Sequence, residues 1–515
     1  MVCDNYRFKF KSKVDIRKVI EEHLINDGVL ALDKLCKKIS IEYTSFFIIA
    51  IFDSRNNKTY ILTDLIRSYS LQVRLGTTYD QISLDDEVLV DRFDCNLPEY
   101  LASGTVSGNL TLSPKVITPG AGEILILDHE LDSYEAKEWE LYSYTNNMHC
   151  LKEASIFDRI KSELESCIDD LICYAKGKTI VLPLSGGLDS RLIAMLLHSK
   201  GYRKVICFTY GKRGNWEAEI SERVATRLEY EWHFIEYNSQ LWNETLNDKE
   251  FYEYIRLCGA GSSTPHIQDW PSIKYLKSNN IIPNDSIIVP GHSTDFLAGS
   301  HLEPDFFTNE KIKKERLIEL MKLRFFQFSS DSDTENESIK AKIDEFISCH
   351  TNNDLIDCKL AAQIFEKWDI KERQAKFIVN STKAYGFFDL DCYIPMWKYS
   401  LYESFYSIPF EFRKNKKVYI DIVEHFNNKY NFNFKPSLKY RVKMKLYNIS
   451  KKHGLYSHLV KLKKTIQGGS INRFGLDNMG WYSIFDDQWL SNNYKPGDKF
   501  YSLMSKFYLD IVDKK

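Results

Sequence analysis

The 515-residue sequence contains no C-x-x-C pair, although it has 11 cysteines. Without paired cysteines the pattern indicates neither a zinc site nor a disulfide framework, and reduced thiols are the simplest interpretation. A large net charge is also absent, since the formal net charge at pH 7 is −2. The 69 Lys and Arg residues nearly balance the 71 Asp and Glu residues, so the overall charge says nothing about partners.

The sequence also lacks a long hydrophobic run near its start. The segment MVCDNYRFKFKSK is polar and basic, with no apolar signal core. The longest apolar run of this region, Phe46 to Phe52, has seven residues, which suits a strand and is too short to span a membrane. We therefore expect a cytoplasmic protein with no transmembrane segment, and the length allows two or three domains.

The most informative stretch, Val181 to Leu197, reads VLPLSGGLDSRLIAMLL. The apolar residues from Ile180 to Leu184 are typical of a strand buried in a parallel sheet, and the apolar residues at the end have the spacing of a helix. The turn SGGLDS, Ser185 to Ser190, lies between them. A glycine turn from strand to helix leaves backbone N–H groups that converge on an anion, usually phosphate.

A tight turn capped by Ser190 or Asp189 would need only the two glycines, so the full SGGLDS is more specific than a turn requires. No lysine follows the glycines, which excludes the GxxxxGK[ST] loop. The motif resembles the signature of the ATP pyrophosphatases, or PP-loop enzymes. The resemblance implies a loop that holds the β- and γ-phosphates as a leaving group while a substrate attacks the α-phosphorus.

The segments around this turn predict alternating strands and helices. We expect strands at 205–211, 232–237 and 287–289, and a helix at 216–228. This order is typical of a doubly wound parallel sheet, whose ligands bind beyond the carboxyl ends of the strands. Asp189 and Asp295 both follow such strand ends and are able to share a Mg²⁺ on a triphosphate. A helix cap explains Asp295 equally well.

The order of the motifs resembles the synthetase domain of asparagine synthetases. SGGLDS is followed by FTYG, then by N-x-E and V-A, and then by G-x-x-x-D after the next core strand. In that family the last motif typically reads GEGxDE. Gly291 and Asp295 match it, whereas His292 and Phe296 stand where the family has acidic residues.

The family also carries a lysine that contacts the triphosphate, in a K-x-x-L-R segment. The matching stretch here begins at Lys417 and lacks the arginine. Lys416 is adjacent, so either lysine fits the pattern. An ordinary surface lysine is the simpler explanation of either residue alone.

The resemblance implies a set of site residues. The loop and nearby backbone groups would bind ATP and pyrophosphate, through Leu184, Ser185, Gly186, Gly187, Asp189, Ser190, Tyr210 and Gly291. Asp189 and Asp295 would bind Mg²⁺, and Lys417 would stabilise the pentavalent phosphorus, so these three residues form the catalytic set. Glu217 and His292 are further candidates for contact with the substrate.

The first 145 residues predict a smaller β-rich α+β domain. We expect strands at 45–53 and 58–64, joined as a hairpin by the polar turn SRNN. The segment YLASGTVSGNLTLSPKVITPGAGEILIL resembles the end of the class II glutamine amidotransferase domain of the family. Intact domains begin with cysteine and carry RGPD and NGE segments. Here Val2 stands in that place and Cys3 is internal, so we expect a degenerate domain without glutaminase activity.

Three domains are therefore expected: the degenerate amidotransferase-like domain at 1–145, the synthetase-like α/β domain at 146–430 and a basic appendix at 431–515. No acidic residue occurs from His425 to Leu476, where lysines and arginines accumulate. This stretch is either a solvated appendix or a patch for an anionic partner. The acidic loop 329–338 is interpreted as solvated.

The predicted activity is that of an ATP-dependent amide ligase. A substrate carboxylate would attack the α-phosphorus of ATP, pyrophosphate would leave, and an amine, most simply ammonia, would displace AMP. A separate glutaminase is an alternative ammonia donor, and a homodimer is left open. The departures at His292 and Phe296 count against free aspartate. Proteins of this kind occur in bacterial surface-polysaccharide gene sets, so amidation of a sugar acid is an alternative.

Two other classes are weighed against the ligase. A PP-loop enzyme that modifies nucleic acid is favoured by the basic stretch, but no paired cysteine and no recognisable RNA-binding module occurs in the sequence. A non-catalytic scaffold would not need the full SGGLDS motif. The predicted function is therefore that of an ATP-dependent amide ligase, with ATP and Mg²⁺ as its cofactors.

Overall fold

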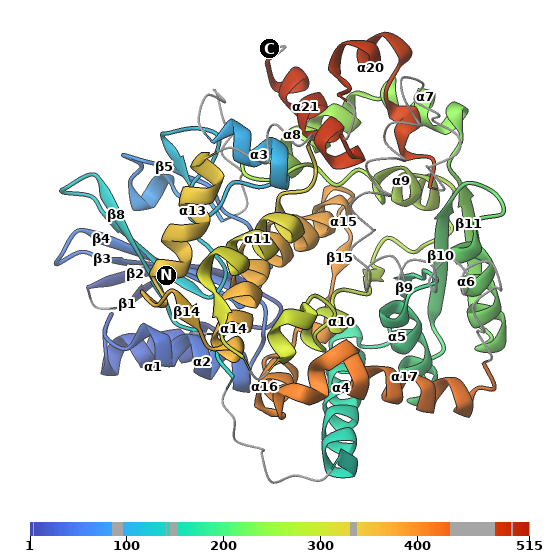
Figure 1. Ribbon diagram of the computed structural model, residues 1–515, viewed down its shortest axis with the longest axis horizontal. Helices are drawn as coiled ribbons and strands as arrows, with labels where there is room; N and C mark the ends of the chain where they lie inside the picture. Colours follow the sequence, from blue (N-terminus) through green and yellow to red (C-terminus); the bar gives the residue numbers. More distant parts are fainter. Residues whose placement is uncertain are drawn as a thin grey trace.

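The computed structural model describes residues 1–3, 5–84, 96–140, 142–144, 153–308, 310–329, 337–432, 479–495 and 498–513. A six-stranded antiparallel sheet and a five-stranded parallel sheet dominate it (Figure 1). Helices surround the parallel sheet, which confirms the predicted α/β class. Within the described ranges, no helix is long and apolar enough to cross a membrane.

The parallel sheet is built from short strands after glycine- and polar-rich turns. Its strands are β9 (Ile180–Pro183), β10 (Val205–Gly211), β11 (Glu231–Glu236), β12 (Ile287–Ile288) and β15 (Asp391–Cys392). They lie in the order β11-β10-β9-β12-β15, and every neighbouring pair is parallel. The chain moves outward from β9 to β10 and β11 and then returns to the other side of β9. The order therefore reverses between β9 and β12, where ligands of such sheets bind.

Both faces of the parallel sheet are covered, as a doubly wound fold requires. Ile180 and Leu182 of β9 belong to one apolar cluster, and Val181 belongs to another. The first cluster contains buried residues of α4 (Glu153–Ala175), α5 (Leu188–Ser199), α6 (Trp216–Arg227) and α17 (Lys417–Lys429). The second contains buried residues of α8 (Lys249–Gly259), α9 (Trp270–Ser278) and α21 (Phe500–Asp513).

The antiparallel sheet confirms a separate β-rich N-terminal region. Its strands, in spatial order, are β1 (Val2–Cys3), β2 (Tyr6–Ser12), β3 (Phe47–Asp53), β4 (Lys58–Thr63), β7 (Glu123–Asp128) and β8 (Ser133–Glu138). The predicted hairpin is β3–β4, closed by the pair Asp53 and Lys58. Helices α1 (Arg17–Asn26) and α2 (Leu32–Glu42) pack on one face. The amidotransferase ancestry of this region stays a prediction.

The remaining elements fill the space between and beside the sheets. The helices are α3 (Leu97–Ser103), α7 (Ser239–Leu246), α10 (Thr294–Leu297), α11 (Lys314–Phe325), α13 (Glu337–Ser348), α14 (Cys358–Trp368), α15 (Lys383–Phe387), α16 (Tyr399–Ser407) and α20 (Asp487–Asn493). Short strand pairs join β5 (Val73–Arg74) to β6 (Val116–Ile117) and β13 (Ile312–Lys313) to β14 (Leu355–Ile356). The basic stretch 433–478 and most of the acidic loop lie outside the described residues.

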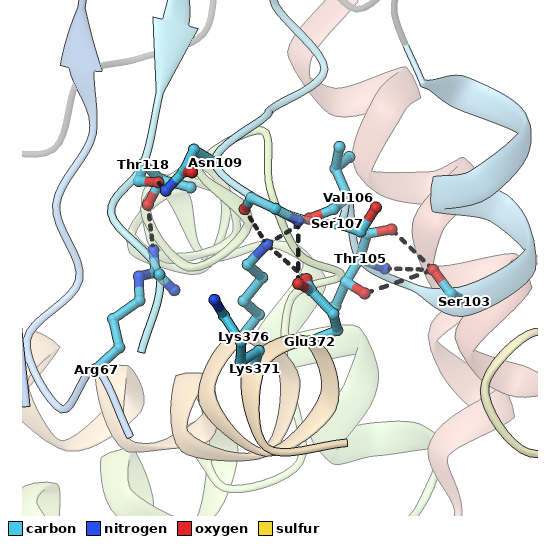
Figure 2. A network of polar contacts seen from close by, with 12 residues as sticks. Arg67, Ser103, Thr105, Val106, Ser107, Asn109, Thr118, Lys371, Glu372 and Lys376 are labelled. Carbon is cyan, nitrogen blue, oxygen red and sulfur yellow. Dashed lines mark hydrogen bonds and ion pairs between the residues drawn. The ribbon is translucent and has the colours of Figure 1, made fainter. Parts of the chain in front are cut away.

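Helix α14 continues as the π-helix η3 (Asp369–Ile378), which buries five polar side chains: Asp369, Lys371, Glu372, Gln374 and Lys376. Figure 2 shows how η3 meets the N-terminal region. The Lys376 ammonium donates to Glu372 at 2.6 Å and to the carbonyl of Val106 at 2.7 Å. Because π-helices are rare and often mark functional sites, η3 is a candidate functional element.

Candidate active site

The SGGLDS loop is closed by its two serines. The Ser185 N–H donates to the Ser190 hydroxyl at 3.1 Å, and the Gly187 N–H donates to the Ser185 hydroxyl at 3.2 Å. Helix α5 begins directly after Gly187, and no side chain caps it. Its first N–H groups have no acceptor inside the helix, so they are available to an anion.

Two glycines bring other segments close to this loop. A Cβ atom at Gly291 would lie only 2.7 Å from the Ser190 nitrogen, so the turn after β12 rests directly on the loop backbone. A Cβ atom at Gly186 would lie 2.7 Å from the Trp216 ring. The Gly186 N–H also donates to the Glu217 carboxylate, and burial raises the pKa of that carboxyl. Glu217 therefore supports the loop from α6.

The structure brings Asp189 and Asp295 together at the β9–β12 switch point. The Asp295 N–H points to Asp189 Oδ2 at 3.4 Å, and the Tyr419 hydroxyl donates to Asp189 Oδ1. Burial, together with the negative charge of Asp295, raises the pKa of Asp189 to about 7. Burial is the larger cause, because it removes the ionised carboxylate from water, and repulsion from the neighbouring Asp295 carboxylate adds to it.

The two candidate lysines point to different carboxylates. Lys416 Nζ lies 3.8 Å from Asp295 Oδ2, whereas Lys417 Nζ pairs with Glu153 of α4. The Lys417 side chain is 51% exposed and that of Lys416 is 25% exposed. Asn415 and Lys416 both have left-handed backbone angles, with φ of 54° and 58°. This turn before α17 directs Lys416 to the carboxylates, and the structure does not bring Lys417 to them.

The other predicted contacts lie around the same edge of the sheet. The Leu184 N–H donates to the Phe208 carbonyl at 2.8 Å, and the Leu184 carbonyl accepts from the Thr209 hydroxyl at 2.6 Å. The Tyr210 ring stacks on Tyr237, with centroids 4.8 Å apart. The side chain of Tyr210 thus packs inward, and a contact between its backbone and adenosine stays a prediction.

His292 follows Gly291 in the turn between β12 and α10. Its Nε2 is 3.0 Å from the Ser381 hydroxyl, and burial lowers the pKa of His292 to about 4. The imidazole is therefore neutral at pH 7 and is suited to hydrogen bonding rather than to carrying charge. Phe296 is fully buried against Trp397, with ring centroids 6.0 Å apart.

Tyr419 is a site residue that the sequence did not single out. Tyr419 lies two residues after Lys417, in the segment that matches the family's lysine motif. A buried position on a helix explains a tyrosine there equally well, so the sequence alone does not assign it a role. Only the fold shows that its hydroxyl reaches Asp189.

The carboxylate pair fits a Mg²⁺ that arrives with ATP. Among the described residues no group of three His, Cys, Asp or Glu side chains is close enough to hold a metal alone. Mg²⁺ commonly takes one or two carboxylates and completes its shell with phosphate oxygens and water. The negative charge of Asp295 adds to the effect of burial in raising the pKa of Asp189, and a cation bound between the two carboxylates would offset that repulsion. Asp189 and Asp295 are therefore suited to such an ion.

Comparison with known proteins finds a protein-family match, in the middle of the chain. Residues 175–279 match the model of the asparagine synthase family. This part of the chain is therefore similar to the asparagine synthase domain, and it includes the loop and strands β9 to β11. The match ends before Asp295 and the lysines. It supports an ATP-using enzyme of the ligase or transferase type, typically with Mg²⁺, and leaves the substrate open.

Two other comparisons found similar proteins. The chain is 29% identical over 168 residues to mitochondrial tRNA-specific 2-thiouridylase 1 of Gallus gallus. That alignment covers 29% of this chain and 36% of the relative, so the chain spans about a third of its length. A solved structure of an NH3-dependent NAD synthetase from Campylobacter jejuni shares 17% identity, with a TM-score of 0.21, over 40% of this chain and 91% of the other.

Proposed function

We propose that this chain is an ATP-dependent amide ligase that adenylates a carboxylic acid and passes the acyl group to an amine. The observation that carries this proposal is the meeting of Asp189, Asp295 and Lys416 beside the SGGLDS loop. An anion-binding loop, a cation-binding carboxylate pair and a positive side chain are the groups that adenylation needs. The family match supports the same chemistry.

In the first step an oxygen of the substrate carboxylate attacks the α-phosphorus. The bond from that phosphorus to the α,β-bridging oxygen breaks, and pyrophosphate leaves. The N–H groups at the start of α5 and the hydroxyls of Ser185 and Ser190 hold the pyrophosphate. Lys416 offsets the charge on the phosphorus oxygens. Asp189 and Asp295 would hold a Mg²⁺, which would neutralise part of the phosphate charge.

In the second step the amine nitrogen attacks the acyl carbon. The bond from that carbon to the AMP oxygen breaks, AMP leaves, and the nitrogen loses a proton. Ammonia is the simplest amine, supplied free or by a separate glutaminase, and we place the reaction in the cytoplasm. Adenosine is held through backbone groups near Leu184, Tyr210 and Gly291.

A screen for pyrophosphate release tests this proposal. Purified protein, ATP, Mg²⁺ and an ammonium salt are combined with carboxylic acids, including amino acids and sugar acids. We expect pyrophosphate and AMP in equal amounts with one chemical class of acid, and none from the Asp189→Asn variant. Equal release by wild type and Asp189→Asn would contradict the proposed mechanism.

A second candidate is a PP-loop enzyme that modifies nucleic acid. The observation that favours it is the similarity to a tRNA thiouridylase. Nucleobase adenylation would use the same loop, but the sequence has no paired cysteine to carry sulfur. RNA that co-purifies with the protein, together with pyrophosphate release that depends on this RNA and on no carboxylic acid, would favour this candidate.

A further inference from the structure

Tyr419 places a hydroxyl group inside an apolar cluster. Its side chain lies in the first turn of α17, is fully buried, and belongs to the cluster that covers one face of the parallel sheet. A phenol hydroxyl has one proton to donate, and Tyr419 donates it to Asp189 Oδ1. Phenylalanine would fill the same space without the cost of burying a hydroxyl. Packing alone therefore does not explain a tyrosine at this position.

The hydrogen bond from Tyr419 leaves the two oxygens of Asp189 in different surroundings. Oδ1 faces the buried phenol. Oδ2 lies 3.4 Å from the Asp295 nitrogen, which is longer than an ordinary N–H···O bond. The side chain of Asp295 is 39% exposed, and Asp189 is half-buried. Tyr419 thus holds the carboxylate by Oδ1 and leaves Oδ2, the oxygen on the side of Asp295, for a ligand.

A neutral donor suits a carboxylate that binds a cation. A lysine or arginine in the place of Tyr419 would bring a positive charge to Asp189, whereas a hydroxyl orients the carboxylate and leaves its negative charge in place. Carboxylates that bind metal ions are themselves held by hydrogen bonds, and loss of such a partner weakens metal binding about ten- to a hundredfold. The hydroxyl of Tyr419 therefore has the chemistry of a group that supports a metal ligand.

The first turn of α17 contacts both carboxylates of the candidate site. Lys416, the N-cap residue, precedes Tyr419 by three positions, and residues so spaced lie on one side of a helix. Lys416 Nζ is 3.8 Å from Asp295 Oδ2, which is beyond hydrogen-bond distance. A phosphate oxygen can therefore replace Asp295 as the partner of Lys416. The contact of Tyr419 with Asp189, in contrast, is a formed hydrogen bond.

We propose that Tyr419 is the positioning residue of the metal site. It fixes Asp189 through Oδ1, so that Oδ2 and Asp295 are set to hold the Mg²⁺ that arrives with ATP, and Lys416 is left for the phosphates. Tyr419 acts through Asp189 and is not a catalytic residue. The inference rests on the proposed function, because that function brings Mg²⁺ and ATP to the two carboxylates.

The gain in nucleotide affinity that Mg²⁺ provides tests this role without turnover. Calorimetry measures the dissociation constant of α,β-methylene-ATP with Mg²⁺ and with EDTA in its place, and the ratio of the two constants is the gain. Tyr419→Phe should lower the gain about ten- to a hundredfold and leave the constant in EDTA unchanged. Lys416→Ala should weaken binding in both conditions and leave the gain unchanged.

Tyr399→Phe is the matched control. Tyr399 is a buried tyrosine of the same apolar cluster, and its hydroxyl also donates to a carboxylate, Glu140 Oε2, at 2.9 Å. This variant should leave both constants unchanged. If Tyr419→Phe keeps the full gain, or weakens binding equally with Mg²⁺ and with EDTA, the hydroxyl does not position the metal ligand and the proposal is wrong.

Failure of the proposed function gives different results. A protein that shows the expected effect of Tyr419→Phe but releases no pyrophosphate with any acid would contradict the ligase activity and not the role of Tyr419. A wild-type protein whose affinity for the nucleotide gains nothing from Mg²⁺ would overturn both the assignment of the carboxylates to Mg²⁺ and the role of Tyr419.

A measurement on the wild-type protein decides the case in which Tyr419→Phe does not fold. In crystals grown with Mn²⁺ and α,β-methylene-ATP, anomalous scattering locates the metal ion. We expect Mn²⁺ at coordination distance from Asp189 Oδ2 and from Asp295, with the Tyr419 hydroxyl still bonded to Oδ1. Mn²⁺ bound through Oδ1 with the Tyr419 hydroxyl displaced, or bound away from Asp189, would overturn the proposal.

Discussion

The side chains of the neighbouring residues Lys416 and Lys417 point to different carboxylates, and this difference indicates which lysine belongs to the candidate site. Lys416 adopts a left-handed backbone conformation, with φ of 58°, and forms the N-cap of α17. Lys417 is the first helical residue, and its side chain reaches Glu153 on the surface. A non-glycine residue in the left-handed region costs free energy, and such residues cluster at functional sites. This geometry favours Lys416 for the role that the sequence pattern assigned to Lys417.

We predict that Lys416→Ala lowers the adenylation rate about 10²- to 10³-fold, the usual effect of removing one preorganised charge stabiliser. Lys417→Ala is the matched control, and it should leave the rate within about threefold because an exposed ion pair contributes little. Single-turnover pyrophosphate release measures both rates. The reverse order of effects would assign the role to Lys417.

Asp189 is the residue whose substitution best separates function from stability. Its carboxylate is shielded from solvent and faces the charge of Asp295, so the ionised form is disfavoured in the folded protein. We predict that Asp189→Asn abolishes pyrophosphate release and leaves the thermal midpoint of the ligand-free protein equal or higher. Mg²⁺ and ATP should raise the midpoint of the wild type only. A fall of the midpoint in the variant would indicate a structural role.

At the scale of elements, the strands and the loop were predictable and the π-helix was not. Ile180 to Leu184 and Val205 to Gly211 have local apolar patterns that specify buried strands. The segment Asp369 to Ile378 is rich in charge and resembles a solvated helix by composition. It is buried because Lys371 meets Glu123, 248 residues away in the chain, which no local pattern encodes.

The same long-range dependence limited the prediction of the candidate site. The SGGLDS motif was enough to predict the turn between strand and helix. The proximity of Asp189 and Asp295 was predictable because the carboxyl ends of parallel strands meet at one edge of a sheet. The direction of Lys416 depends on a backbone turn. Tertiary contacts of this kind leave no periodicity in the sequence.

The ion pair between η3 and the N-terminal sheet gives a prediction about pH. Burial alone would raise the pKa of Glu123, but the charge and hydrogen bond of Lys371 outweigh it and lower that pKa below 4.5. A carboxyl whose pKa is lowered by folding stabilises the fold above its unfolded pKa. This contribution is lost as the pH falls through the folded pKa. The pair therefore stabilises the protein at neutral pH and less in acid.

We predict that Glu123→Gln lowers the free energy of unfolding at pH 7 by about 1.5–3 kcal/mol, because it removes one of the two carboxylates that pair with the buried Lys371 ammonium and leaves Glu138 as the other. The difference from wild type should narrow as the pH falls below 4.5. Urea unfolding at several pH values measures it. Exposed Glu130→Gln is the control. A difference that stays constant from pH 7 to pH 3 would contradict the assigned cause.

For the whole molecule, the two sheets share one apolar core. A single cluster of buried side chains contains Phe8 and Phe47 of the antiparallel sheet as well as Ile180 and Ile193 of the α/β domain. Trp139 lies between the two parts, with ring centroids 6.4 Å from both Phe47 and Tyr399. Separate domains normally meet through smaller and more polar interfaces. We infer that the N-terminal region acts as a fixed platform for η3 and α16.

A shared core predicts cooperative unfolding of both sheets. Amides of β3 and β4 should exchange hydrogen with the same free energy of opening as amides of β9 and β10, within about 1 kcal/mol, because neither sheet keeps its core when the other opens. Native-state hydrogen exchange resolved by peptide measures both, and Glu123→Gln should lower both by the same amount. If the antiparallel sheet opened at a clearly lower free energy, the N-terminal region would be an independent domain. Its contacts with η3 would then be free to break without disturbing the loop.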